Sequence, residues 1–186
     1  MDLTGCSLCA LAGSAGGVAA GLAAAVPGAV VVPMDGFHLT TERLHQLGAV
    51  ERRGAPDTFD ADGYVELLRR LRASGGTVRA PDFDRSIEEP VPDAIAVAPD
   101  VPLVITEGNY LLLDDPPWRD LRGGLDALGF VAGPEPRRVE RLVARFRSFG
   151  WDEERARNRV LTGSDAANAR IVAASRANAD RIVHLD

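Results

Sequence analysis

The chain has 186 residues and a mass of 19.8 kDa, with 46% hydrophobic residues, 26% charged residues and a formal net charge of −6. These values are typical of a single globular domain, expected here over residues 1–186, and they exclude collagen, coiled coil and low-complexity disorder. The negative charge argues against a nucleic-acid partner. All 21 basic residues are arginine, so the chain contains no lysine.

The first third of the chain is unusually poor in charge, since no charged residue lies between Leu3 and Met34. Glycines and prolines interrupt this stretch, which is unfavourable for a membrane helix, so we expect buried strands and a helix in a cytoplasmic protein with no membrane association. Cys6 and Cys9 are too few for a disulfide framework. We expect them to point to opposite faces of a strand and to bind no metal, because no second ligand pair accompanies them.

Short apolar runs alternate with amphipathic stretches along the whole chain. In chain order, strands are predicted at 7–12, 29–33, 77–80, 103–106, 127–132 and 181–185. Helices are predicted at 18–26, 61–74, 136–149 and 165–177, with Asp60 and Ser164 as caps of the second and fourth. This alternation predicts an α/β fold in which a doubly wound parallel sheet is flanked by helices.

Polar residues directly after the predicted strands are the candidates for chemistry, because such folds bind ligands at the carboxyl ends of their strands. Asp35 follows the strand at 29–33 and Glu107 follows the strand at 103–106. Two converging carboxylates suit acid–base catalysis or the binding of a metal that carries phosphate. For Asp35 two interpretations remain open here: a base aimed into the crevice, or a side chain that caps its own turn.

Four segments, at 31–38, 53–60, 83–90 and 106–113, resemble the nucleoside/nucleotide kinase group of P-loop proteins, which is related to uridine kinase, phosphoribulokinase and bacterial pantothenate kinase. The resemblance implies a P-loop kinase fold with a lid-like helical segment. It also implies that Asp35 is the base facing a substrate hydroxyl and that Glu107 lies near the metal and phosphates. With these two as catalytic candidates, the substrate-binding candidates are His38, Arg53, Asp57, Asp84, Arg85, Asn109 and Tyr110.

The sequence departs from this family where ATP phosphates would bind. The P-loop motif G-x-x-x-x-G-K-[ST] supplies a lysine and a hydroxyl, whereas alignment from Gly13 places Ala19 and Ala20 at those two positions. We therefore predict a turn between Gly13 and Val18 that is tighter than a phosphate-cradling loop. Weaker candidates for holding an anion are Gly13, Ser14, Gly16, Gly17 and Arg145.

These observations favour an enzyme on a nucleoside-kinase fold that has abandoned ATP phosphotransfer. It would bind a small hydroxylated, nucleoside-like or anionic molecule and use Asp35 for proton transfer. One alternative is an ATP-dependent small-molecule kinase with an unusual phosphate site, for which ATP and Mg²⁺ would be required. The other is a catalytically silent ligand-binding subunit. A homodimer is left open, and no residue is assigned as a resident metal ligand.

Overall fold

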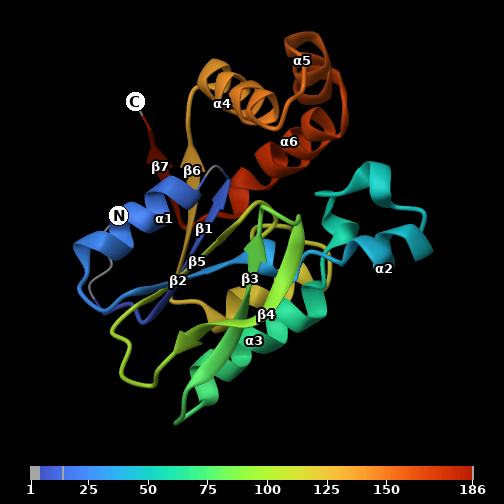
Figure 1. The fold of residues 1–186 in the computed structure, drawn as a ribbon. Coiled ribbons are helices and arrows are strands. Elements are labelled where there is room, and N and C mark those ends of the chain that lie inside the picture. The colour runs from blue at the N-terminus through green and yellow to red at the C-terminus, as the bar shows by residue number, and fades with distance from the viewer. Residues whose placement is uncertain (1–4, 14, 186) are drawn as a thin grey trace.

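A parallel sheet with helices on both faces forms the body of the protein (Figure 1). The computed structural model describes residues 5–13 and 15–185. The sheet has five strands in the order β2-β5-β1-β6-β7, and every neighbouring pair is parallel. The strands are β1 (Leu8–Gly13), β2 (Val30–Pro33), β5 (Val104–Gly108), β6 (Ala127–Ala132) and β7 (Arg181–His184). The predicted fold class is therefore confirmed.

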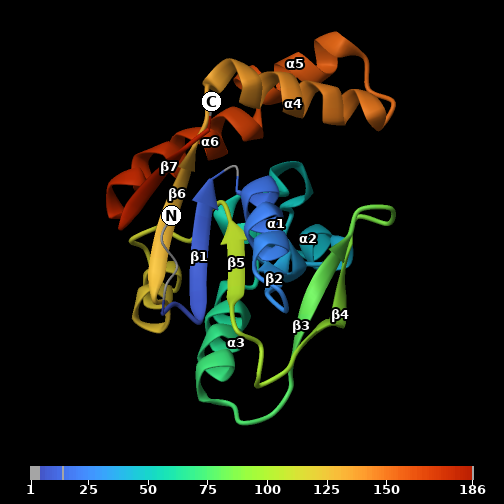
Figure 2. The same ribbon diagram turned by 90° about the vertical axis from the view of Figure 1, so that its left-hand side faces the viewer.

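The helices cover the two faces of the sheet and its carboxyl edge. They are α1 (Gly16–Ala25), α2 (Thr41–Gln46), α3 (Ala61–Ala73), α4 (Glu135–Ser148), α5 (Glu153–Thr162) and α6 (Ser164–Ala174). Figure 2 shows α4 and α5 above the tips of the β1 and β6 arrows. We call α4, α5 and α6 the helical block. None of the helices in the described ranges is long and apolar enough to cross a membrane.

Alternation along β1 divides the core into two layers, because successive side chains of a strand point to opposite faces. Leu8, Ala10 and Ala12 face α3 and join its buried side chains, among them Tyr64 and Leu68. Cys9 and Leu11 face α1 and pack against Ala19. The expectation that Cys6 points away from Cys9 is wrong: Cys6 packs against the same cluster, since it precedes the first residue of the strand.

A separate two-stranded sheet corrects the predicted arrangement of residues 77–80. These residues begin β3 (Val78–Asp84), which pairs only with β4 (Glu89–Val97) in an antiparallel hairpin, and they do not join the main sheet. The hairpin stands beside the β2 edge (Figure 2). The hairpin therefore contacts β2 and the turn that follows it, at the carboxyl ends of the parallel strands.

The two predicted helix caps have different outcomes. The Asp60 side chain accepts a hydrogen bond from the Gly63 amide and caps α3, as expected. At α6 the capping position belongs to Gly163, and Ser164 is the first helical residue, so that prediction is wrong by one position. Helices α2 and α5 were not predicted, because α2 is short and α5 buries only Ala156 and Val160.

Candidate active site at the carboxyl ends of β1, β2 and β5

Three adjacent strands of the sheet end at the candidate site. β5 lies between β2 and β1, and in its register Glu107 stands beside Pro33 on one side and Leu11 on the other. Asp35 lies just past β2 in a tight 3-10 turn, Met34–Phe37. That turn packs so closely on β5 that a Cβ at Gly108 would lie 2.4 Å from the Cβ of Met34. The topology thus brings Asp35 and Glu107 to one edge.

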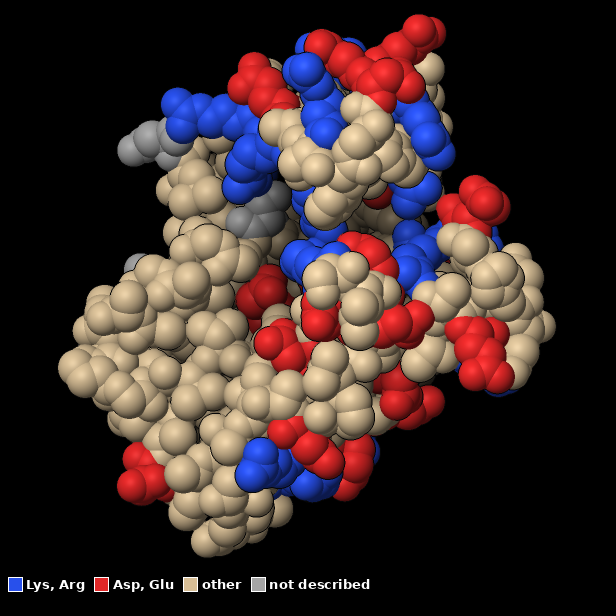
Figure 3. Space-filling model, in the orientation of Figure 1, with Lys and Arg blue, Asp and Glu red and all other residues tan. Residues whose placement is uncertain are grey.

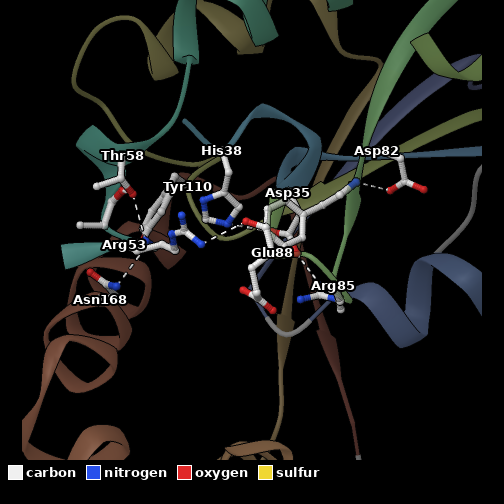
Figure 4. Close-up of polar contacts among 12 residues, drawn as sticks. Asp35, His38, Arg53, Thr58, Asp82, Arg85, Glu88, Tyr110 and Asn168 are labelled. Atoms are coloured by element: carbon white, nitrogen blue, oxygen red, sulfur yellow. Dashed lines mark hydrogen bonds and ion pairs between the residues drawn. The ribbon is translucent and has the colours of Figure 1, made fainter. Parts of the chain in front are cut away.

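The side chain of Asp35 is held from outside its own turn (Figure 4). The Arg85 guanidinium, from the turn of the β3–β4 hairpin, donates to Asp35 Oδ2 at 2.6 Å. The His38 Nε2 lies 3.9 Å from Asp35 Oδ1. Of the two interpretations left open by the sequence, the structure favours the one in which the carboxylate faces other elements of the site.

Glu107 lies deeper in the fold and against the start of α1. A Cβ on Gly16 would be 3.8 Å from Glu107 Oε2, so the carboxyl group faces the first turn of that helix. Burial and, to a smaller extent, the negative charge of Asp35 raise the pKa of Glu107 to about 7, although the positive charge of Arg85 opposes this shift. Near neutral pH, Glu107 can therefore exist in either protonation state.

His38 is packed as a neutral aromatic ring. It stacks on Phe59 with ring centroids 4.0 Å apart, and its centroid lies 5.0 Å from that of Phe83. Burial lowers the pKa of His38 to about 4. The imidazole is therefore uncharged at neutral pH, and its Nδ1 is buried without a hydrogen-bond partner. This environment supports Asp35 better than His38 as the proton acceptor.

The segment 52–58, which we call the substrate loop, contains two further candidates. Arg53 donates to the carbonyl of Glu88 at 3.1 Å and to the hydroxyl of Thr41, which ties the loop to the hairpin. Asp57 forms an ion pair with Arg52, and both side chains are more than half exposed. The structure thus places Arg53 beside the hairpin and Asp57 on the rim.

The other substrate-binding candidates are dispersed. Asp84 accepts hydrogen bonds from the amide and hydroxyl of Ser86, which lower the pKa of this exposed carboxyl group and hold it in the hairpin turn. Asn109 is exposed just past β5. Tyr110 is fully buried, and its hydroxyl donates to the carbonyl of Gly54. Asp84 and Tyr110 therefore stabilise the segments around the site, whereas Arg85 reaches Asp35 directly.

On the side expected to hold phosphate, β1 ends at Gly13 and α1 begins at Gly16. The amide of Ala15 donates to the carbonyl of Gly13 at 2.8 Å. That the turn between Gly13 and Val18 is tighter than a phosphate-cradling loop stays a prediction. Gly17 is exposed in the first turn of α1. Ser14 lies outside the described residues.

Arg145, on α4 of the helical block, interacts electrostatically with groups of this site, and its guanidinium lies 5.8 Å from the centroid of the Phe149 ring. Although the residue is exposed, protein surrounds its guanidinium sufficiently for burial to lower its pKa, and the positive charge of Arg85 lowers it further. The negative charges of Asp35 and Glu88 act in the opposite direction. Figure 3 shows positive and negative side chains gathered where the helical block meets the body.

Two polar residues of this region were not among the candidates from the sequence. Asn168, on α6, donates to the carbonyl of Gly54 at 3.0 Å, and Thr41 bonds to Arg53. Neither follows a predicted strand, and each contacts a residue more than ten positions away. The only available signal was their polarity, which many surface residues share.

Comparison with known proteins identifies relatives along most of the chain. No family model matches it. The ATP-dependent kinase-like protein notR′ of Aspergillus versicolor is 37% identical over 158 residues, which are 81% of this chain and 87% of that protein. A solved structure from Silicibacter sp. TM1040, of a protein proposed to be a fructose transport system kinase, has a TM-score of 0.88 and 38% identity, over 95% of this chain and 89% of that one.

A third relative is much longer than this chain. The proposed uridine kinase C227.14 of Schizosaccharomyces pombe is 40% identical over 122 residues, which are 63% of this chain but only 49% of that protein. The chain thus spans about half of that relative, in contrast to its near-complete coverage of notR′.

These relatives overturn the leading functional expectation from the sequence. The expectation of an enzyme that has abandoned ATP phosphotransfer is contradicted, because notR′ is named an ATP-dependent kinase-like protein and further relatives are named ATP-dependent kinases. The missing lysine was given too much weight, since it is a single group among many that can neutralise phosphate charge. By its sequence identity and its fold, the chain belongs to the P-loop kinase family that includes uridine kinase-like proteins and the YFH7 kinases.

Proposed function

We propose that the protein is an ATP-dependent small-molecule kinase that transfers the γ-phosphoryl group to a hydroxyl of its substrate. The observation that carries this proposal is the position of Asp35, which lies at a strand end with Arg85 at 2.6 Å and Arg145 within electrostatic reach. A carboxylate beside two cations suits a reaction in which a hydroxyl loses a proton while phosphate charge develops nearby. The names of the relatives support the same reaction class.

In the proposed reaction, Asp35 is the general base. Its carboxylate accepts the proton of the substrate hydroxyl while that oxygen bonds to the γ-phosphorus, and the bond from phosphorus to the β,γ-bridging oxygen breaks to release ADP. The hydroxyl must approach the carboxylate that Arg85 now contacts, so Arg85 orients the base before the substrate arrives. Asp35 is only partly exposed, with 29% of its side chain accessible.

Arginines supply the positive charge that a P-loop lysine provides in related enzymes. Arg85 comes from the hairpin and Arg145 from the helical block, and the positive charge of Arg85 helps to lower the pKa of Arg145. An anion bound between them would relieve this repulsion. The amides at the start of α1, from Gly16 onward, add the positive end of a helix dipole. We propose that these groups together bind the ATP phosphates.

A magnesium ion bound to ATP fits the same edge. Mg²⁺ is usually held by one or two carboxylates together with substrate phosphates and water. Glu107 is the carboxylate proposed for this role, since Asp35 serves as the base, and the described residues contain no cluster of three or more acidic, histidine or cysteine ligands. When bound with ATP, the ion would neutralise phosphate charge.

The proposal is tested by incubating the protein with ATP, Mg²⁺ and a panel of acceptors. The panel starts with uridine and fructose, which the names of relatives suggest, and continues with other nucleosides, hexoses, pentoses and hydroxy acids. We expect ADP release that depends on one acceptor class, together with a phosphorylated product detected by mass spectrometry. ADP release that no acceptor stimulates, or failure of ATP–Mg²⁺ to bind in a calorimetric titration, would overturn the proposal.

A further inference from the structure

The carbonyl of Gly54 is held by side chains from two separate parts of the protein. The Tyr110 hydroxyl donates to it from the end of β5, and the Asn168 amide donates to it at 3.0 Å from α6 (Figure 4). Gly54 has a φ of +92°, a backbone conformation that residues other than glycine rarely adopt. The position of this carbonyl is therefore fixed both by the sheet and by the helical block.

The two donors, Tyr110 and Asn168, belong to different parts of the protein. Tyr110 is fully buried and lies three residues past Glu107, so it belongs to the rigid body. Asn168 belongs to the helical block, in which α6 packs on α5 and α5 packs on α4, the helix of Arg145. A change in the position of the helical block is therefore transmitted to Gly54 through Asn168.

From Gly54 the contacts continue to the general base. The neighbouring Arg53 donates to the carbonyl of Glu88 in the turn of the β3–β4 hairpin. Arg85 in the same turn donates to Asp35. Three polar contacts thus connect the helical block to the substrate loop, the loop to the hairpin, and the hairpin to the base (Figure 4).

We propose that Asn168 is a positioning residue that couples the phosphate side of the site to the acceptor side. This inference rests on the proposed function, since it requires ATP to be bound partly by Arg145. When ATP fixes the helical block, Asn168 fixes Gly54 and with it the substrate loop and Arg53. ATP binding then prepares the acceptor site before the acceptor arrives, and coupling of this kind is reciprocal.

Hydrogen exchange with ATP–Mg²⁺ as the probe measures this coupling without any knowledge of the acceptor. We expect ATP–Mg²⁺ to slow amide exchange both in α4 and in the substrate loop, where the Gly54 amide bonds to Thr58 and the Thr58 amide bonds to Ala55. In Asn168→Asp, which keeps the side chain's shape but removes its donor, α4 should remain protected. Protection of the substrate loop should fall by about tenfold, the effect of losing one hydrogen bond.

A second variant and a matched control complete the test. Asn168→Ala should behave like Asn168→Asp, and Asn158→Ala, at an exposed position of α5, should retain protection of the loop. Protection of the substrate loop that persists in both Asn168 variants would overturn the coupling role. Protection of the wild type that is confined to α4 would also overturn it, but would leave the proposed kinase function intact. Absence of ATP-dependent protection everywhere would overturn both proposals.

Discussion

The proposed base of the candidate site is positioned by a contact between residues fifty positions apart. Asp35 and Arg85 form an ion pair whose members are 29% and 49% exposed, so its contribution to stability is small, about 1 kcal/mol or less. The ion pair matters mainly for orientation, because the Arg85 guanidinium holds the Asp35 carboxylate away from the turn that contains Asp35. At the scale of single residues, the site therefore depends more on orientation than on stabilisation.

Replacing Asp35 by Asn tests its role as the base. Asparagine keeps the shape of the side chain but cannot accept the hydroxyl proton, so we expect kcat of Asp35→Asn to fall by about 10²- to 10⁴-fold while ATP binding is retained. Steady-state kinetics and calorimetric titration measure the two effects. Asp82→Asn is the control, since Asp82 is exposed on β3 and accepts a hydrogen bond from the amide of its neighbour Phe83. Full activity in Asp35→Asn would move the proton transfer elsewhere.

Glu107 predicts a pH dependence of stability. Its pKa is about 7 in the folded protein against an ordinary value of 4.5, so between these values the folded state binds more protons than the unfolded state. The free energy of unfolding therefore falls as the pH rises through this range, and the full destabilisation, about 3 kcal/mol for this shift, is present above pH 7.

Glu107→Gln removes this titration. Its advantage in stability over the wild type should grow between pH 5 and pH 8, as measured by urea unfolding at both values. Glu66→Gln, at an exposed position of α3, should give the same difference from the wild type at both pH values. A constant difference for Glu107→Gln as well would show that its carboxyl group titrates normally.

At the scale of elements, the sequence predicted the parallel strands well and the hairpin poorly. The runs at 7–12, 29–33, 103–106, 127–132 and 181–185 each overlap a strand of the main sheet. The first four are recognisable because buried parallel strands are short, continuous and apolar, whereas the edge strand β7 is mostly exposed. β4 was missed because Pro90 and Pro92 lie within it and much of it is exposed, whereas strand patterns disfavour proline. Without β4, the hairpin that carries Arg85 could not be predicted.

Close packing between the hairpin and the turn that bears Asp35 gives a prediction at this scale. A Cβ at Gly36 would lie 2.5 Å from the carbonyl oxygen of Pro81, so Gly36→Ala must push β3 away. We expect a loss of about 1–3 kcal/mol in the free energy of unfolding, together with reduced kcat as Arg85 is displaced. Urea unfolding and kinetics measure both effects. Gly75→Ala, at a position with open space, should leave them nearly unchanged; equal effects from the two variants would exclude the packing explanation.

At the scale of the whole molecule, the site joins parts that no local motif connects. Arg85 comes from the hairpin and Arg145 from the helical block, sixty residues later, and they approach each other only in the folded protein. A motif search considers one loop at a time, so the lysine missing from the loop after β1 suggested a loss of kinase chemistry. The positive charges of Arg85 and Arg145 come together only through the tertiary structure. The pattern of strands and helices was enough to predict the fold, but it did not show that these arginines lie near one site, so the leading functional prediction was wrong.

Arg145 tests whether the helical block contributes to phosphoryl transfer. Its guanidinium is partly surrounded by protein and lies within electrostatic reach of Asp35, where phosphate charge would develop. Removing it in Arg145→Ala should lower kcat by about 10²- to 10³-fold and raise KM for ATP, because charge stabilisation is the main catalytic contribution in this reaction class. Arg145→Lys should recover part of the loss, since lysine supplies the charge without the planar fork of donors. Arg157→Ala, at an exposed position of α5, is the matched control. Unchanged kcat/KM for ATP in Arg145→Ala would instead assign the phosphate charge to Arg85 and the start of α1, the other groups proposed to bind the ATP phosphates.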